Sequence, residues 1–257
     1  MRSLKDLLEP LALPASDPRP SGGYAFPAAQ VLGAPLPQGH LHVWSGPPGA
    51  GKTAFLLGLL LVEARRGRHV VLASYDLSAA ALALRLLAME SGVPLHDLEG
   101  AELSPAEAAE VARARARLEG LPLYLLEARG LTAASLEDRC VRAPCRVDVL
   151  GVDYAEAVVR PSSQPVAGAF RDLSTLAQQR WIAVVAIARS SPVERGAMDE
   201  APAADRVWRI APDTATGASA AEVILNRHGA KPSCRLRLES ESGRFVAEPG
   251  VPPPLRT

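Results

Sequence analysis

The chain has 257 residues, enough to bury one sizeable hydrophobic core, and its 28 lysine and arginine residues balance 28 aspartate and glutamate residues. Zero net charge argues against a protein that coats nucleic acid or an anionic membrane by bulk attraction, although it leaves room for a local patch. The longest apolar stretches are too short to span a bilayer, and no apolar signal core follows the N-terminus, so we expect a cytoplasmic protein with no membrane partner.

The N-terminal region predicts a short arm rather than a domain. Leu4–Leu11 is amphipathic, and the proline and glycine residues between Pro14 and Gly23 favour an extended lead-in. We therefore expect residues 1–35 to form this arm and residues 36–247 to form one domain. Residues 248–257 are proline-rich, so we expect a disordered tail.

Apolar strand-like runs alternate with leucine- and alanine-rich helical segments from about Leu41 onward. This alternation is typical of an α/β fold, in which βαβ units build a mainly parallel central sheet flanked by helices on both faces. The runs are Leu41–Ser45, His69–Ser74, Leu121–Leu126, Val147–Asp153 and Ile182–Ala188. Four later runs lack intervening helices, so they predict antiparallel strands at the C-terminal edge of the same sheet. These are Asp205–Ile210, Ala220–Arg227, Cys234–Leu238 and Arg244–Ala247.

Cysteine and histidine residues give no sign of a metal site. The cysteines are too few and too loosely spaced for zinc, and their odd number makes a poor disulfide framework, so we expect reduced, structural thiols. The histidines are scattered, with no His-Glu-x-x-His pattern, so we expect them at the surface or in packing. The residues are Cys140, Cys145, Cys234, His40, His42, His69, His96 and His228.

One run fits the phosphate-loop pattern G-x-x-x-x-G-K-[ST] between a predicted strand and a predicted helix. It reads Gly46, Pro47, Pro48, Gly49, Ala50, Gly51, Lys52, Thr53. In such a loop, backbone N–H groups and the positive end of the helix dipole form a concave anion site, and glycine avoids a Cβ clash. Lys52 would reach the β- and γ-phosphates of a nucleotide, and the Thr53 hydroxyl would ligate Mg²⁺. Only three residues are lysine, so Lys52 stands out against the arginine-rich composition.

A second carboxylate is needed to hold Mg²⁺ and its water, and the strand Val147–Asp153 ends in one. Asp153 stands where a Walker B aspartate is expected. Asp148 is the weaker candidate because it interrupts the start of the same apolar run.

An ordered series of segments resembles the RecA-fold motor domain of DnaB-type replicative helicases. Val70–Ser78 and the arginine-leucine helix after it resemble the region that follows the first helix in that family, and Val152–Tyr154 resembles its Ile-Asp-Tyr. The other segments are Ser91–Pro94, Ala106–Leu118, Leu121–Tyr124, Gly130–Thr132 and Ala220–Leu225. The resemblance spans roughly residues 36–247 and indicates a divergent member.

The resemblance implies a RecA-like P-loop ATPase that uses ATP and Mg²⁺ and assembles as a homo-hexameric ring. Each nucleotide would lie at a subunit interface, and single-stranded DNA would pass through the centre. Three departures weaken this expectation. The family's catalytic glutamate aligns with Asp76, its γ-phosphate-sensing glutamine aligns with Arg189, and its trans-acting Lys-x-Arg aligns with Arg227-His228-Gly229.

These departures predict slow hydrolysis. Loss of an arginine finger costs roughly 10³ to 10⁵ in rate in other phosphoryl-transfer systems, and the finger position here is Gly229. Arg227 lies two residues earlier, on the same face of a strand, and would substitute in part. The catalytic candidates are therefore Lys52, Asp76 and Asp153.

The sequence offers only a weak footprint for single-stranded DNA. The candidate channel loops, Arg160–Gly168 and Arg189–Ala204, mix arginines with acids and contain no aromatic residue for base stacking. Arg113, Arg115 and Arg117 are interspersed with glutamates, so we interpret them as a solvated helix face.

Three functional hypotheses stay open. The first is a DnaB-like ATPase that acts on single-stranded DNA or in a replication-related assembly. The second is a catalytically degenerate relative that binds nucleotide as a regulatory or scaffolding signal and acts through a protein partner. The third is a recombinase or clock-type ATPase of the wider RecA group, suggested by the Gly-Pro-Pro-Gly of the phosphate loop.

Overall fold

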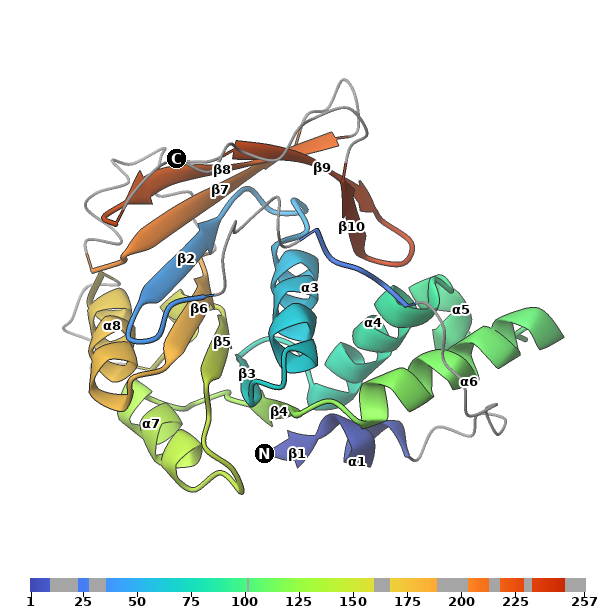
Figure 1. The fold of residues 1–257 in the computed structure, drawn as a ribbon, viewed down its shortest axis with the longest axis horizontal. Helices are drawn as coiled ribbons and strands as arrows, with labels where there is room; N and C mark the ends of the chain where they lie inside the picture. Colours follow the sequence, from blue (N-terminus) through green and yellow to red (C-terminus); the bar gives the residue numbers. More distant parts are fainter. Residues whose placement is uncertain are drawn as a thin grey trace.

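The computed structural model describes residues 1–9, 23–27, 36–100, 102–159, 167–188, 203–212, 218–228 and 233–247. Within these residues, ten strands form a single sheet in the order β1-β4-β3-β5-β6-β2-β7-β8-β9-β10. Figure 1 shows helices packed on both faces of this sheet.

Six neighbouring strands are parallel and form the centre of the sheet. They are β4 (Leu123–Glu127), β3 (Val70–Ser74), β5 (Val149–Asp153), β6 (Ala183–Ile187), β2 (Leu41–Ser45) and β7 (Arg206–Pro212). In β2, β3, β5 and β6 every residue is buried, as expected for parallel strands covered on both faces. The α/β fold class predicted from the sequence is confirmed.

Antiparallel strands extend the C-terminal edge. They are β8 (Ala218–Asn226), β9 (Ser233–Glu239) and β10 (Arg244–Ala247), each paired with its predecessor. The expectation that all four late strands are antiparallel was wrong for β7, which lies parallel to β2. β7 begins at the same end of the sheet as β2, so the two strands run parallel.

Two hydrophobic clusters lie on the two faces of the sheet. Alternation along β2 divides them: Trp44 belongs to the cluster beneath α3, and Val43 belongs to the cluster beneath α8. The first face carries α1 (Leu4–Leu8), α3 (Lys52–Arg65), α4 (Ala79–Ser91), α5 (Leu95–Gly100) and α6 (Pro105–Glu119); the second carries α7 (Ala133–Val141) and α8 (Ala167–Arg180). A short 3₁₀ turn, η1 (Ala155–Ala157), follows β5.

Helix ends follow local sequence signals. Ser78 caps α4 at its start, and Gly92 ends it in the left-handed conformation. Ser104 and Glu107 form a capping box at the start of α6, where Pro105 is the first helical residue. Among the described residues, we find no helix with the length and apolar character needed to cross a membrane.

The first nine residues pack onto the domain. β1 (Arg2–Ser3) pairs with β4, and the buried residues Leu4, Leu7 and Leu8 join the cluster beneath α3. The N-terminal helix ends at Leu8, three residues before the predicted end at Leu11. These residues add a short strand to the sheet and three leucines to the core. The expected C-terminal tail lies outside the described residues.

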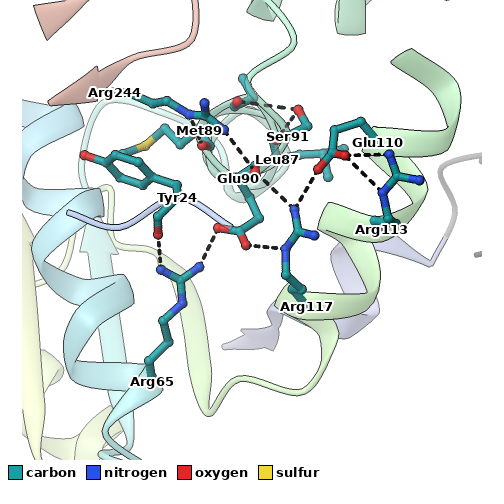
Figure 2. A network of polar contacts seen from close by, with 11 residues as sticks. Tyr24, Arg65, Leu87, Met89, Glu90, Ser91, Glu110, Arg113, Arg117 and Arg244 are labelled. Carbon is teal, nitrogen blue, oxygen red and sulfur yellow. Dashed lines mark hydrogen bonds and ion pairs between the residues drawn. The ribbon is translucent and has the colours of Figure 1, made fainter. Parts of the chain in front are cut away.

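A buried acid, Glu90, ties α4 to α3 and α6. Its side chain is fully buried and forms ion pairs with Arg65 at 2.5 Å and with Arg117 at 2.6 Å. Figure 2 shows the Glu90 carboxylate between these two guanidinium groups. Arg244 of β10 also donates to the backbone carbonyls of Met89 and Glu90, at 2.6 and 3.1 Å. The Glu90 carboxylate therefore joins α3, α4 and α6, and the backbone at the end of α4 joins β10.

The same cluster corrects the prediction for the α6 arginines. Arg113 and Arg115 pair with Glu110 and Glu119 along the helix surface, as expected of a solvated face. The Arg117 side chain, however, is only 11% exposed and reaches the buried Glu90. Pairing with an acid on another helix could not be read from spacing within α6.

Residues 23–27 lie against α3 and are held by this cluster. Arg65 donates to the Tyr24 carbonyl, and the Tyr24 hydroxyl exchanges hydrogen bonds with the Phe245 backbone at 2.9 Å. Phe26 packs edge-on against Phe55 with ring centroids 4.9 Å apart. A Cβ on Gly58 would lie 2.4 Å from the Phe26 ring, so Gly58 provides the space for it.

Candidate functional site

The phosphate loop connects the C-terminal end of β2 to α3, at the centre of the sheet. Gly49 and Gly51 have φ values of 80° and 78°, which side-chain-bearing residues rarely adopt. A Cβ on Gly46 would lie 2.5 Å from the Ile210 carbonyl oxygen of β7. Glycine at these positions therefore meets backbone and packing constraints as well as the requirements of an anion site.

The loop presents backbone amides at the start of α3. Phe55 N donates to Gly51 O at 2.8 Å, and the amides that precede it have no acceptor within the helix. The helix dipole adds partial positive charge at the same end. The part of the loop from Pro47 to Gly49 is exposed, so an anion can reach it. This geometry suits a phosphate chain.

Lys52 folds back over the loop. Its Nζ donates to the Gly46 and Pro47 carbonyl oxygens, both at 2.8 Å, and the residue is 7% exposed. Burial lowers the Lys52 pKa, while the negative charges of Asp153 and Glu156 act in the opposite direction. The loop thus holds a compact cation beside the amides.

Thr53 and Asp153 meet at the mouth of the loop. The Thr53 hydroxyl donates to Asp153 Oδ2 at 3.0 Å, and Asp153 is 1% exposed at the end of β5. Tyr75 N donates to Asp153 O at 2.7 Å, which ties the end of β5 to the turn after β3. A hydroxyl and a carboxylate at this separation are the hard oxygen ligands that Mg²⁺ prefers, so these residues fit the ion.

Asp148 lies at the other end of the same strand. Its Oδ2 accepts a hydrogen bond from His69 N at 3.0 Å, which closes the starting edge of the sheet. The preference for Asp153 over Asp148 as the Mg²⁺ residue is therefore consistent with the geometry.

Asp76 lies at the same end of the sheet as Asp153, where the parallel strands end. Ser74 of β3 pairs with Asp153 of β5, and Asp76 follows two residues later in an exposed turn. Arg129 donates to the Asp76 carbonyl oxygen at 2.9 Å, which fixes the backbone of the turn.

Glu156 is a site residue that sequence reasoning missed. It lies in η1, three residues after Asp153, and its charge raises the Lys52 pKa against the effect of burial. Only its closeness to Asp153 in the chain could have indicated it, since no motif assigns an acid there.

Arg227 lies away from this site, at the end of the sheet where the parallel strands begin. Its Nε donates to Ala204 O at 2.9 Å and its N donates to Asp205 O at 3.0 Å, beside the first residue of β7. The distance along the strands from this position to the C-terminal end of β2 is roughly 13 Å, at about 3.3 Å per strand residue. Arg227 therefore cannot reach the phosphate loop of its own chain. Arg189 and Gly229 lie outside the described residues, as do the central parts of both candidate channel loops.

The fold and the loop define a RecA-like P-loop NTPase. The chain superimposes on a solved structure of a DnaB-like replicative helicase with a TM-score of 0.75 and 16% sequence identity, over 82% of this chain and 59% of the other. The superposition on the RadB recombinase covers 84% of this chain and 94% of that protein, with a TM-score of 0.54 and 16% identity.

Residues 30–204 match the family described as the DnaB-like helicase C terminal domain, and the chain belongs to that family. A relative named replicative DNA helicase DnaB, from Leifsonia xyli, is 23% identical over 176 residues, which cover 65% of this chain and 38% of the relative. The chain thus spans well under half the length of this relative. Family membership favours the two DnaB-like hypotheses over the recombinase or clock-type ATPase.

Proposed function

We propose that this protein is an ATP-binding and weakly ATP-hydrolysing RecA-fold subunit that acts in a ring with Mg²⁺ as its cofactor. The observation that carries this proposal is the convergence of Lys52, Thr53 and Asp153 at the phosphate loop, with Thr53 Oγ1 and Asp153 Oδ2 at 3.0 Å. The amides at the start of α3 bind the phosphates, and Lys52 neutralises their charge. Thr53 and Asp153 would hold Mg²⁺, which would supply charge neutralisation to the phosphates.

The residues expected to catalyse hydrolysis match the family less well than those expected to bind the nucleotide. Asp76 has a side chain one methylene shorter than glutamate, and it stands in an exposed turn. A misplacement of about 1 Å can cost on the order of a hundredfold in rate. Slow turnover with intact nucleotide binding is the expected outcome.

The position of Arg227 supports a subunit interface. Arg227 lies where the parallel strands begin, and its own phosphate loop lies where they end. Arg227 can therefore act on a nucleotide only when that nucleotide is bound to another subunit. This supports an assembly of several subunits, for which the resemblance implies a homo-hexameric ring. The replicative helicase name of the relatives motivates single-stranded DNA as the substrate that passes through the ring.

A second function is favoured by one observation. The Arg227 guanidinium donates to the Ala204 carbonyl, so part of the group is used within its own chain. If this contact persists in the assembly, the protein binds nucleotide as a regulatory or scaffolding signal and acts through a protein partner.

Nucleotide binding and turnover distinguish these functions. We would measure MgATP affinity by calorimetry, and steady-state hydrolysis with and without single-stranded DNA, for wild type, Lys52→Ala and Lys5→Ala. Lys5 is an exposed lysine on α1 and serves as the matched control. Loss of binding in Lys52→Ala alone, with slow DNA-stimulated turnover in wild type, supports the ATPase. Binding without turnover supports the regulatory function, and equal binding by both variants refutes both.

A gain-of-function variant tests the interface. Gly229→Arg restores an arginine at the finger position, so turnover should rise at least about tenfold if rings form. Rings formed with nucleotide but no change in rate would contradict the assignment of this edge as the trans-acting face.

A further inference from the structure

Three of the five histidines of the chain gather where the parallel strands of the central sheet begin, and one of them, His228, is far in sequence from the other two. His40 precedes β2, and His228 follows β8. Their neighbour Asp205 precedes β7. Ligand atoms of His40, Asp205 and His228 all lie within 4.8 Å of one another. The third histidine is His42, on the same face of β2 as His40.

The carboxylate of this cluster is held in a defined orientation. Asp205 Oδ2 accepts a hydrogen bond from Leu41 N at 2.8 Å, which directs Oδ1 to the His228 ring nitrogen Nε2 at 3.0 Å. The rings of His40 and His228 lie 4.5 Å apart. In tetrahedral zinc sites, bonds of about 2.0–2.1 Å place ligand atoms roughly 3.3 Å apart, so small side-chain rotations bring all three atoms to bonding distance.

The buried His42 is an independent observation that favours a polar ligand at this cluster. It is 1% exposed, and neither of its ring nitrogens has a hydrogen-bond partner among the described residues. A buried polar group without a partner is costly, so it calls for an explanation. Its ring centroid lies 6.3 Å from that of His40, and the two ring planes are inclined by 29°. A metal-bound water beside His40 would provide the missing partner.

The ligand chemistry selects the class of ion. Two imidazoles and one carboxylate suit Zn²⁺, Co²⁺ or Ni²⁺, whereas Mg²⁺ and Ca²⁺ prefer oxygen ligands. His40 and Asp205 are partly buried and His228 is exposed, so the ion can enter from solvent. Arg206 directly follows Asp205 and Arg227 directly precedes His228, and their positive charges oppose a cation. We therefore expect affinity in the micromolar range rather than that of a buried structural site.

We propose that His40, Asp205 and His228 form a binding site for a divalent transition metal ion, with Zn²⁺ as the expected occupant and water in the open position. Such an ion joins the residue before β2, the residue before β7 and the end of β8. Because His228 directly follows Arg227, occupancy would also fix the Arg227 backbone. This last consequence rests on the proposed function, whereas the metal site itself does not.

The test measures metal binding directly. Chelator-treated, dialysed protein is titrated with Zn²⁺ by calorimetry and with Co²⁺ by visible absorption, in excess Mg²⁺ so that the Thr53–Asp153 site is filled. The variants are His228→Ala and His40→Ala. The matched control is His96→Ala, because His96 and Asp97 form a surface pair at 3.1 Å outside the three-residue cluster.

We expect one ion per chain in wild type and in His96→Ala, and affinity at least about tenfold lower in both cluster variants. Circular dichroism verifies that each variant is folded. Zinc should also raise the melting temperature of wild type more than that of His228→Ala. Unchanged affinity in folded His228→Ala and His40→Ala would overturn the site, as would the absence of a one-to-one Zn²⁺ complex at millimolar concentration.

Discussion

Replacement of Glu90 by glutamine should destabilise the domain strongly, because it removes the negative charge that organises α3, α4 and α6. The glutamine keeps nearly the same shape, so the change isolates charge from packing. In wild type the carboxylate is fully buried between Arg65 and Arg117. Glu90→Gln removes the ionic partner of Arg65 and leaves Arg117 with Glu110 alone, at 3.0 Å.

The expected loss in free energy of unfolding follows from how exposed the two arginine side chains are. The Arg117 side chain is 11% exposed, so it loses its buried partner in a largely desolvated position and keeps only the partly exposed Glu110, whereas Arg65 is 31% exposed and is partly screened by water. Removal of one partner from a buried ion pair costs about 3–5 kcal/mol, and the screening of Arg65 places the expected loss at the lower end, roughly 3 kcal/mol. For a domain of this size, that corresponds to a fall of about 6–12 °C in Tm.

Glu110→Gln is the matched control. Glu110 also pairs with Arg117, at 3.0 Å, but its side chain is 34% exposed. Its loss should cost under about 1 kcal/mol. Urea unfolding monitored by circular dichroism gives both free energies of unfolding. Equal losses for the two variants would refute the argument that burial of Glu90 sets the effect.

Two further predictions concern thiols and carboxylates. Burial raises the pKa of Cys140 and of Cys234 to about 12, so at pH 8 both stay protonated and should react with a thiol reagent far more slowly than the partly exposed Cys145. Rapid labelling of three thiols in the native protein would contradict this. If Asp76 orients the attacking water, Asp76→Asn should lower turnover at least about tenfold with little change in MgATP affinity, whereas Glu156→Gln should chiefly change that affinity, because Glu156 acts on Lys52. The opposite pattern would make Glu156 the better candidate for the base.

The central strands and the phosphate loop were predictable because their signals are local. Buried parallel strands appear as continuous apolar runs, and the run Gly46–Thr53 fits a pattern whose glycines serve backbone geometry and whose lysine and threonine serve phosphate and Mg²⁺ binding. The direction of β7 was not predictable in this way. The direction depends on the end of the sheet at which the chain re-enters it. The apolar pattern of the run Asp205–Ile210 does not distinguish a parallel from an antiparallel strand.

Contacts between distant elements explain the remaining misses. Glu90 and Arg117 lie on different helices, and nothing in the sequence near Arg117 indicates that it is buried. The histidines looked scattered because His40 and His228 are brought together only when β8 pairs beside β7 and β7 beside β2. Secondary-structure periodicity identifies which residues share a face of one element, but it does not show which elements become neighbours.

The account depends most directly on Mg²⁺-dependent binding of ATP at Asp153. Calorimetry with and without Mg²⁺ on wild type, Asp153→Asn and Asp148→Asn tests it, since Asp148 directly precedes β5, Asp153 ends it, and only Asp153 contacts Thr53. We predict that Asp153→Asn loses the gain in ATP affinity that Mg²⁺ provides and that Asp148→Asn keeps it. Full Mg²⁺-dependent affinity in folded Asp153→Asn would contradict the proposed site.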